Sequence, residues 1–361
     1  MHALQELDAY FRDRSARDEF AGVVLVTQGH EQRFAGAYGY ASRAWRIPNT
    51  LDTRFDTASV TKLFTAIATL QLVDRGLFGV DTRAVDFLGL AGTAISPDAT
   101  VYHLLTHTSG IGDDSEEEDG EVYEDLWKTR SNYAVVETAD FLPQFVHKPA
   151  NFPPGAGCRY CNCSFILLGL MIERATGQSY RDYVREHVFA PAGMTRSDFF
   201  RLDRFHEEVA EGADPIRDGH GRIVGWKKNI YSFPPIGSPD SGAHVTAGDL
   251  DRFLRAVQAG RLLSSERTAD FLTPHAFYRQ TDEWRILYGY GLSFYFDRSD
   301  RLIFYQKGGI NAGVSAMLRH YPADDVTVVL LSNMEDGAWD PVWQVHEAIM
   351  ARSSEGQGRG S

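Results

Sequence analysis

The 361-residue chain lacks any run of about 20 apolar residues, the length that a helix needs to cross a bilayer. It also lacks an excess of positive charge, because 36 Lys and Arg stand against 49 Asp and Glu, and the formal net charge is -13. A chain with this charge repels nucleic acid and anionic membrane surfaces. We therefore expect neither nucleic acid nor a membrane among its partners.

The first residues lack the continuous apolar segment and the small-residue cleavage site of a signal peptide. Residues 1–15 instead place Leu4, Leu7, Tyr10 and Phe11 on one side of a helix, with charged residues elsewhere. We expect an amphipathic helix here and a cytoplasmic protein.

Cysteine is scarce, since Cys158, Cys161 and Cys163 are the only three in the chain and lie close together in it. Three thiols without an obvious fourth ligand fall short of the usual zinc patterns. We expect reduced cysteines with structural roles, and neither a metal ion nor a cofactor.

What the chain does have is the composition of a soluble globular protein, with 43% hydrophobic and 24% charged residues. Its length predicts about two domains, because a single core stops growing near about 250 to 300 residues. Strand signals gather at the two ends of the sequence and helix signals in the middle. Strands are expected at 22–27, 33–38, 291–296, 302–306, 313–320 and 326–331, and helices at 59–75, 100–106, 138–146, 165–176, 246–257 and 341–351.

This order of elements predicts an α+β fold with a discontinuous sheet domain. Residues 1–75 and 240–352 are expected to form an antiparallel sheet flanked by N- and C-terminal helices, and residues 76–239 a mostly helical inserted domain. Residues 353–361, rich in Gly and Ser, are predicted to be a disordered tail.

An acidic segment, defined here as residues 113–125, contains nine Asp and Glu. A like-charge run of this kind is usually a mobile, solvated loop, which is our expectation, although it can also guard a cleft entrance or repel anionic ligands.

The chain's single Ser-x-x-Lys pattern, Ser59 to Lys62, opens a long apolar helix that Gly76 is expected to end. Side chains three residues apart on a helix share one face, the arrangement of a nucleophile beside its base. A lysine amine takes a serine proton only when it is neutral, and burial of the helix is expected to supply that state. Alone the pattern is weak, and the alternative is a helix start with a solvated lysine.

Two further patterns occur once each. Tyr160-Cys161-Asn162 offers a second proton carrier on an expected loop, and Lys307-Gly308-Gly309 follows the strand expected at 302–306. The glycine pair is expected to let a substrate approach the strand backbone closely. The helix that begins at Ser59 lies where the two predicted domains join, and clefts between domains are preferred ligand sites.

The three patterns in this order resemble the serine β-lactamase and penicillin-binding-protein superfamily, closest to its class C β-lactamase-like and family VIII esterase branch. The resemblance covers nearly the whole chain. Its other parts are Leu104-Leu105-Thr106-His107-Thr108-Ser109-Gly110, Pro154-Gly155, Leu168-Gly169, Glu173 to Gly177, Pro191-Ala192-Gly193-Met194 and Ser241-Gly242-Ala243. It implies a β-lactamase-like fold.

The resemblance also implies catalytic roles. Ser59 is the expected acylated nucleophile, Lys62 its activating partner, and Tyr160 the phenol that carries protons between nucleophile, leaving group and water. Asn162 is expected to orient Lys62 and the substrate.

The remaining implied roles belong to the strand motif. Lys307 is expected to lower the pKa of Tyr160 and to attract anionic substrate groups. The oxyanion hole is expected to combine the backbone N–H of Ser59 with that of Ile310, directly after Gly308 and Gly309.

Two positions depart from the family pattern. Cys161 replaces the usual Ser, which should leave the loop intact. Gly308 replaces a Thr or Ser whose hydroxyl helps lactamases bind the substrate carboxylate, so β-lactamase activity is doubtful and Gly308→Thr is expected to improve lactam turnover alone. His103 and His107 have zinc-compatible spacing but are interpreted as structural because they lie in the family's Leu-Leu-Thr-His segment.

The predicted function is a serine hydrolase that forms an acyl-enzyme on Ser59 and hydrolyses small carboxylic esters. Alternatives with the same residues are an acyltransferase or transpeptidase of natural-product metabolism, a D-amino-acid amidase and a β-lactamase. The non-enzyme alternative is a penicillin-binding sensor. The expected partner is thus a small-molecule ester, amide or lactam, while the oligomeric state stays open.

Overall fold

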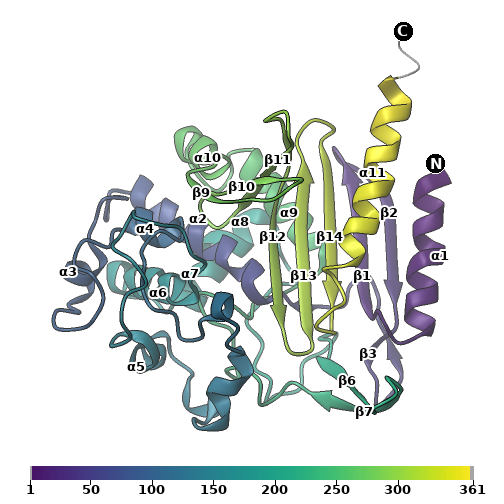
Figure 1. The fold of residues 1–361 in the computed structure, drawn as a ribbon, viewed down its shortest axis with the longest axis horizontal. Coiled ribbons are helices and arrows are strands. Elements are labelled where there is room, and N and C mark those ends of the chain that lie inside the picture. The colour runs from purple at the N-terminus through teal and green to yellow at the C-terminus, as the bar shows by residue number, and fades with distance from the viewer. Residues whose placement is uncertain (1, 358–361) are drawn as a thin grey trace.

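The computed structural model describes residues 2–357, whose centre is an eight-stranded antiparallel sheet (Figure 1). The strand order is β2-β1-β14-β13-β12-β11-β10-β9. The strands are β1 Gly22–Gln28, β2 Glu31–Tyr38, β9 Ala276–Gln280, β10 Arg285–Tyr288, β11 Ser293–Phe296, β12 Leu302–Asn311, β13 Val314–Tyr321 and β14 Val326–Ser332. Strands from the two ends of the sequence are therefore neighbours, as predicted.

The central strands are buried on both faces. Every residue of β13 and β14 is buried, and β14 reads Val-Thr-Val-Val-Leu-Leu-Ser. Such a run is typical of a strand covered on both sides, since a half-exposed strand would alternate apolar and polar residues.

Two terminal helices cover one face of the sheet. Leu7 and Phe11 of α1 (His2–Ala16) and Val342 and Val345 of α11 (Pro341–Gln357) pack in one apolar cluster with Phe304 of β12. Figure 1 shows α1 and α11 side by side against the strands. The helix α11 continues through Gln357, so 353–357 are helical rather than part of a disordered tail, and 358–361 lie outside the described residues.

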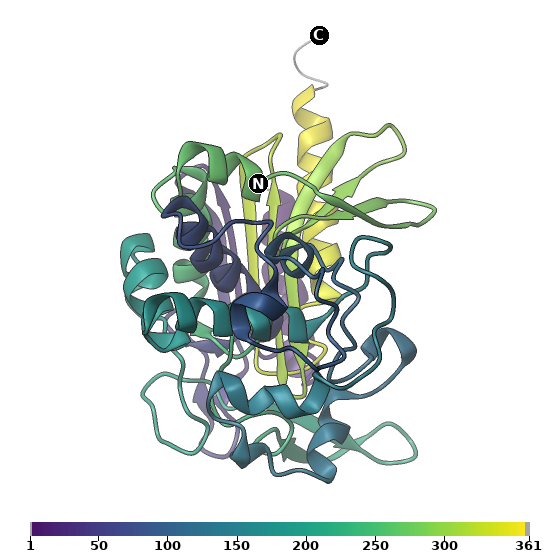
Figure 2. The same ribbon diagram turned by 90° about the vertical axis from the view of Figure 1, so that its left-hand side faces the viewer.

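The other face of the sheet packs against the remaining helices, which extend away from it in Figures 1 and 2. The nearly all-buried α2 runs through this larger core. These helices are α2 Lys62–Asp74, α3 Ala84–Leu88, α4 Val101–Leu105, α5 Leu142–Phe145, α6 Asn162–Thr176, α7 Tyr180–Val184, α8 Ala190–Ala192, α9 Ala247–Gln258 and α10 Ser265–Phe271.

Short elements complete the described chain. The 3-10 turns are η1 Ala58–Thr61, η2 Glu117–Asp119, η3 Tyr123–Lys128, η4 Asn132–Ala134 and η5 Thr138–Phe141, with a π-helical turn η6 at Arg185–Phe189. The two-stranded ribbons pair β3 (Tyr40–Ser42) with β4 (Ile47–Pro48), β5 (Phe55–Asp56) with β8 (His244–Val245), and β6 (Ala213–Arg217) with β7 (Ile223–Lys228). Among residues 2–357, no helix combines the length and apolar character needed to cross a membrane.

The α+β fold class and the flanking terminal helices are confirmed, while the domain boundaries stay a prediction. Three features were not predicted from the sequence. The strands β9 and β10 extend the sheet, the hairpin of β6 and β7 interrupts the mostly helical region, and β12 continues to Asn311 instead of ending at Gln306.

Candidate active site

The turn that carries Ser59 is tied to the sheet side of the molecule. Ala58 adopts a left-handed backbone with φ of 43°, and its N–H donates to the Asp56 carboxylate at 2.7 Å. The hydroxyl of Thr57 donates to the Ala243 carbonyl at 2.8 Å. A non-glycine residue in this conformation is held there by its surroundings, so Ser59 stands at a fixed, strained turn.

The predicted helix start divides into two pieces. Ser59 lies in the 3-10 turn η1, and the α-helix α2 begins at Lys62 and is followed by Gly76, whose φ is 70°. The spacing still brings the two side chains together, because Lys62 Nζ lies 3.2 Å from Ser59 Oγ.

Lys62 is fully buried and has three hydrogen-bond acceptors. Its Nζ donates to Ser59 Oγ at 3.2 Å, to Asn162 Oδ1 at 2.8 Å and to the Asp240 carbonyl at 2.8 Å. Three acceptors match the three N–H bonds of an ammonium group. Asn162 is thus in direct contact with Lys62, and its role in orienting Lys62 and the substrate stays a prediction.

The expectation of a neutral Lys62 is wrong. Burial lowers the pKa of the amine, but the nearby acidic groups, Tyr160, Asp240 and Asp113, outweigh it and raise the pKa above its ordinary value. The residue is thus a buried cation beside Ser59. A group that accepts the proton of Ser59 would therefore have to be another side chain.

Tyr160 is the group placed for that role. Its hydroxyl donates to Ser59 Oγ at 2.7 Å, and Lys62 Nζ lies 5.1 Å from the centre of its ring. Burial raises the pKa of the phenol, while the Lys62 charge and the bond to Ser59 lower it. On balance the pKa of Tyr160 stays above its ordinary value, and the cation of Lys62 reduces the rise that burial causes.

His107 holds the loop that carries Tyr160. Its Nδ1 accepts the N–H of Cys161 at 3.1 Å, and its ring lies 4.7 Å from the ring of Tyr160. His103 instead caps α4 through Thr100. Both histidines make structural contacts.

Lys307 lies within β12 and not at its end. The side chain is 4% exposed, and among the described residues its Nζ has no hydrogen-bond acceptor. Burial and the charge of Lys62 hold its pKa well below the ordinary lysine value. Its Nζ lies 4.7 Å from the centre of the Tyr160 ring, while the largest effect that lowers the pKa of Tyr160 comes from Lys62, so the expected effect of Lys307 on Tyr160 stays a prediction.

The two glycines after Lys307 leave room for other parts of the protein to pack closely against β12. A Cβ on Gly309 would lie 2.8 Å from the backbone nitrogen of Ser59, so its absence lets β12 run beside the nucleophile turn. A Cβ on Gly308 would lie 2.8 Å from the indole ring of Trp339. Ile310, which follows, is 43% exposed and borders the cavity in front of Ser59.

That cavity has a volume of about 300 Å³. Every predicted site residue lines it except Lys62, which is buried beside Ser59. Its wall has an aromatic part and an acidic part. The aromatic part comprises Tyr123, Tyr160, Tyr278, Tyr288, Tyr295 and Trp339, and the acidic part comprises Asp113, Glu116, Glu117, Glu118 and Asp240.

The acidic segment is buried only at its start, so the expectation of a solvated loop is wrong for residues 113–115, while 117–122 and 125 are exposed. Asp113 and Asp114 are 3% and 1% exposed. Further along, Arg159 pairs with Glu116 at 2.8 Å, and the N–H of Tyr160 donates to Glu118 at 3.1 Å. The segment therefore forms part of the cavity wall beside Tyr160.

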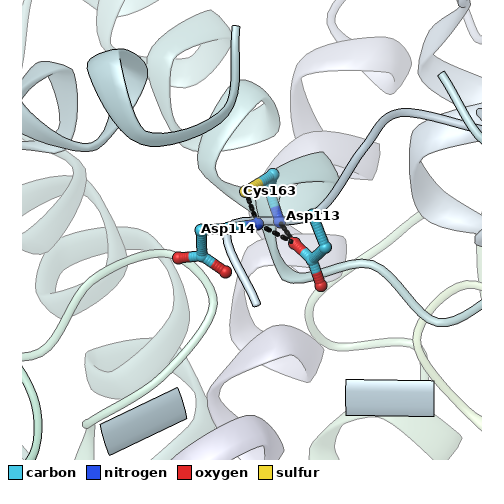
Figure 3. Close-up of side chains that lie close together, drawn as sticks. All are labelled: Asp113, Asp114 and Cys163. Carbon is cyan, nitrogen blue, oxygen red and sulfur yellow. Dashed lines mark hydrogen bonds between the residues drawn. The ribbon is translucent and has the colours of Figure 1, made fainter. Parts of the chain in front are cut away.

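The three cysteines are free thiols, as predicted. Cys163 lies next to Asp113 and Asp114, and one ligand atom from each lies within 4.8 Å of the others (Figure 3). The Sγ of Cys163 accepts the Asp114 N–H at 3.2 Å, and Asp113 accepts the N–H groups of Asn162 and Cys163. The Sγ of Cys163 and the carboxylate oxygens of Asp113 thus accept hydrogen bonds from backbone N–H groups.

The sequence model of the family described as Beta-lactamase matches residues 7–343. The chain belongs to the beta-lactamase family. It is a serine hydrolase of the superfamily that contains serine β-lactamases and penicillin-binding proteins.

Relatives of this beta-lactamase-family chain include an esterase and penicillin-binding proteins. Esterase EstB of Burkholderia gladioli is 32% identical over 73% of this chain and 72% of its own length. Penicillin-binding protein 4 of Amycolatopsis lactamdurans is 28% identical over 82% of this chain and 76% of its own length. The crystal structure of a penicillin-binding protein from Bacillus halodurans superposes with a TM-score of 0.84 at 38% identity, covering 94% and 99% of the two chains.

Three residues of the beta-lactamase-family site were missed by sequence reasoning. Asp240 accepts from Lys62 through its backbone carbonyl, for which no side-chain pattern exists, and its carboxylate raises the pKa of Lys62. Trp339 is distant in sequence from the other motifs, and Asp113 was assigned with its acidic neighbours to a solvated loop. The only apolar signal directly before Asp113 is Ile111, which is 3% exposed.

Proposed function

We propose that this beta-lactamase-family hydrolase forms an acyl-enzyme on Ser59 and hydrolyses small carboxylic esters. The observation that carries the proposal is the surrounding of Ser59 Oγ, which lies 2.7 Å from the Tyr160 phenol and 3.2 Å from the Lys62 ammonium. Ser59 and Tyr160 also border a cavity large enough for a small substrate.

Acylation starts from the ionised form of Tyr160, which has lost its proton to solvent; this phenolate takes the proton of Ser59 while Oγ forms a bond to the ester carbonyl carbon. The bond from that carbon to the alcohol oxygen then breaks, and Tyr160 returns the proton to the departing alkoxide. Lys62 remains protonated throughout and stabilises the phenolate, since its three hydrogen-bond acceptors stay in place.

The oxyanion is stabilised by backbone donors. We assign this role to the N–H groups of Ser59 and Ile310, because the glycine at 309 lets β12 lie directly beside the nitrogen of Ser59. One such donor typically contributes about 10² to 10³ in rate.

Deacylation repeats the proton path with water. Tyr160 takes a proton from water as its oxygen attacks the acyl carbon, and gives that proton to Ser59 Oγ as the acyl bond breaks. The carboxylic acid is released and Ser59 is regenerated, so the cycle consumes one ester and one water.

The cavity favours an uncharged ester over a carboxylate-bearing lactam. Gly308 supplies no hydroxyl, and the Trp339 ring occupies the place of a side chain at that position. The carboxyl of Glu117 borders the cavity, and burial together with Asp113 raises its pKa to about 6, so it is largely ionised at pH 7 and repels a substrate carboxylate.

The acidic wall favours one alternative, the hydrolysis of an amino-acid amide. A substrate ammonium group placed near Glu116, Glu117 or Glu118 would gain electrostatic stabilisation from these carboxylates. The same Ser59 and Tyr160 steps apply, with an amine as the leaving group.

A steady-state screen tests both the nucleophile and the substrate class. Wild type and Ser59→Ala are assayed with short-chain p-nitrophenyl esters, nitrocefin and D-amino-acid p-nitroanilides. We expect kcat/KM for the best ester to exceed that for nitrocefin by at least about tenfold, the value of one missing charge-assisted hydrogen bond. Faster anilide or nitrocefin turnover would overturn the ester assignment, and turnover by Ser59→Ala would overturn the nucleophile.

A further inference from the structure

We propose that Asp113 is a positioning residue for catalysis, whose buried carboxylate fixes the start of α6 and thereby places Tyr160 and Asn162 around Ser59. The inference rests on the proposed roles of Tyr160 and Asn162 in the hydrolase. It assigns a function to a residue of the acidic segment that touches neither Ser59 nor a reacting atom.

The carboxylate of Asp113 accepts hydrogen bonds mainly from backbone N–H groups. Its Oδ2 accepts the N–H of Asn162 at 2.8 Å. Its Oδ1 accepts the N–H groups of Cys163 at 2.9 Å and of Asp114 at 3.1 Å (Figure 3), and the thiol of Cys161 at 3.7 Å. Both oxygens act as acceptors, the pattern that an ionised carboxylate gives. The carboxylate therefore joins the acidic segment to the motif Tyr160-Cys161-Asn162.

The start of α6 depends on this carboxylate. The first N–H groups of a helix have no partner within the helix, and a side chain at the N-cap position usually accepts from one of them. In α6 that position is Cys161, which makes no side-chain cap bond. Asp113 supplies the missing acceptor from a distant part of the sequence, and a negative charge at a helix N-terminus is itself favourable.

The placement of the catalytic groups follows from the fixed helix start. Asn162 is the first residue of α6, and its Oδ1 accepts from Lys62 Nζ at 2.8 Å. Tyr160 precedes it by two residues and reaches Ser59 Oγ at 2.7 Å. A shift of about 1 Å in such a group can cost about 10²-fold in rate, so the position of this backbone matters for the chemistry.

The carboxylate also acts on Lys62 through its charge. Asp113 is one of the groups that hold the pKa of Lys62 above its ordinary value, after Tyr160 and Asp240. The same residue thus supports both the geometry of the motif and the cationic state of its neighbour.

The decisive variant is Asp113→Asn, with Asp114→Asn as the matched control. The asparagine keeps the size of the side chain, but its amide NH2 would face a backbone N–H that the carboxylate now accepts. Asp114 is equally buried, yet among residues 2–357 its carboxyl group accepts only the N–H of Ser115, at 2.9 Å. The pair therefore separates the cap of α6 from the general effect of replacing a buried carboxyl group in this segment.

Single-turnover acylation by a p-nitrophenyl ester is the measurement, made on folded protein at equal concentration. For Asp113→Asn we expect the maximal acylation rate to fall about 10- to 100-fold and the half-saturating ester concentration to stay within about twofold of wild type. Asp114→Asn should acylate within about threefold of the wild-type rate. A wild-type rate in Asp113→Asn, or equal losses in the two variants, would overturn the proposal.

Asp113→Glu keeps the inference testable if the asparagine variant does not fold. It retains the charge and the acceptors but displaces them by one methylene, so the maximal rate should again fall with an unchanged half-saturating concentration. A wild-type rate in this variant would contradict the positioning role. The Ser59→Ala variant, with Asp113 unchanged, tests the proposed function separately. Continued ester turnover by this variant would show that Ser59 is not the nucleophile, independently of the result for Asp113.

Discussion

At the scale of single residues, the proposed chemistry depends on the charge of Lys62. The ammonium group is held by Ser59 Oγ, Asn162 Oδ1 and the Asp240 carbonyl, and acidic neighbours raise its pKa. A cation 5.1 Å from the ring centre of Tyr160 partly offsets the rise that burial gives the pKa of that phenol, which supports Tyr160 as the proposed proton acceptor.

Lys62→Met tests this assignment through the pH dependence of the rate. Removal of the cation leaves burial to raise the pKa of Tyr160 further, so the acidic limb of the kcat/KM profile should move to higher pH and activity at pH 7 should fall by about 10² or more. The check is a pH–rate profile for one ester with both proteins. An unchanged limb with a robust rate would show that Tyr160 does not need the cation.

Tyr160→Phe removes only the hydroxyl that carries the proton. We expect kcat/KM to fall by about 10² to 10⁴ while the melting temperature changes little. Tyr183→Phe is the matched control, because that buried phenol donates to Gln71 and lies outside the cavity wall. Comparable rates in the two variants would mean that another group transfers the proton.

The sequence patterns identified Ser59, Lys62 and Tyr160, which the structure brings together, but they did not indicate the charge state of Lys62. Ser59 and Lys62 share a helical turn, so spacing alone brings them together. The carbonyl of Asp240, the third acceptor for Lys62, lies 178 positions away in the sequence, and no local sequence pattern predicts this contact. The protonation of a buried lysine is decided by such partners.

At the scale of elements, the strand β12 forms one side of the cavity and Trp339 covers part of it. The indole Nε1 of Trp339 donates to the Gly309 carbonyl at 3.3 Å, and the ring stands where a side chain at 308 would lie. Glycine at 308 and tryptophan at 339 are therefore complementary in shape, and changing one constrains the other.

Gly308→Thr should consequently lower kcat/KM for esters and for nitrocefin alike, contrary to the expectation of a selective gain for lactams. The new side chain overlaps the indole and destabilises the fold by about 1 to 3 kcal/mol. Trp339→Ala in the same chain should relieve the overlap and recover stability, a non-additive result measurable by thermal unfolding and kinetics. A fully active single variant with improved nitrocefin turnover would show that the ring moves aside freely.

Elements defined by composition alone were the least predictable. The acidic segment reads as solvated, yet backbone N–H groups and Arg159 give its carboxylates partners that exist only in the folded chain. The strands β9 and β10 are short and partly exposed, so their apolar pattern is weak. Strong patterns, such as the mostly apolar β14 and the helix α2, were predicted within a few residues.

At the scale of the whole molecule, the site lies where the two halves of the fold meet. The turn η1 packs against β12, while α2 continues into the core between the sheet and the other helices. The sheet supplies Lys307 and the strand edge, and the helices supply Lys62 and Asn162. The α+β class could be predicted because long periodic segments at both ends of the chain must pair to bury their apolar residues.

The most direct test of the central claim is intact-protein and peptide mass spectrometry of the acyl-enzyme, trapped by rapid acid quench during turnover of a p-nitrophenyl ester. The account predicts one acyl group per chain, located on the peptide that contains Ser59, and no adduct in Ser59→Ala. Tyr160→Phe should acquire the same adduct more slowly. An acyl group on another residue, or ester turnover by Ser59→Ala above a few per cent of the wild-type rate, would contradict the account.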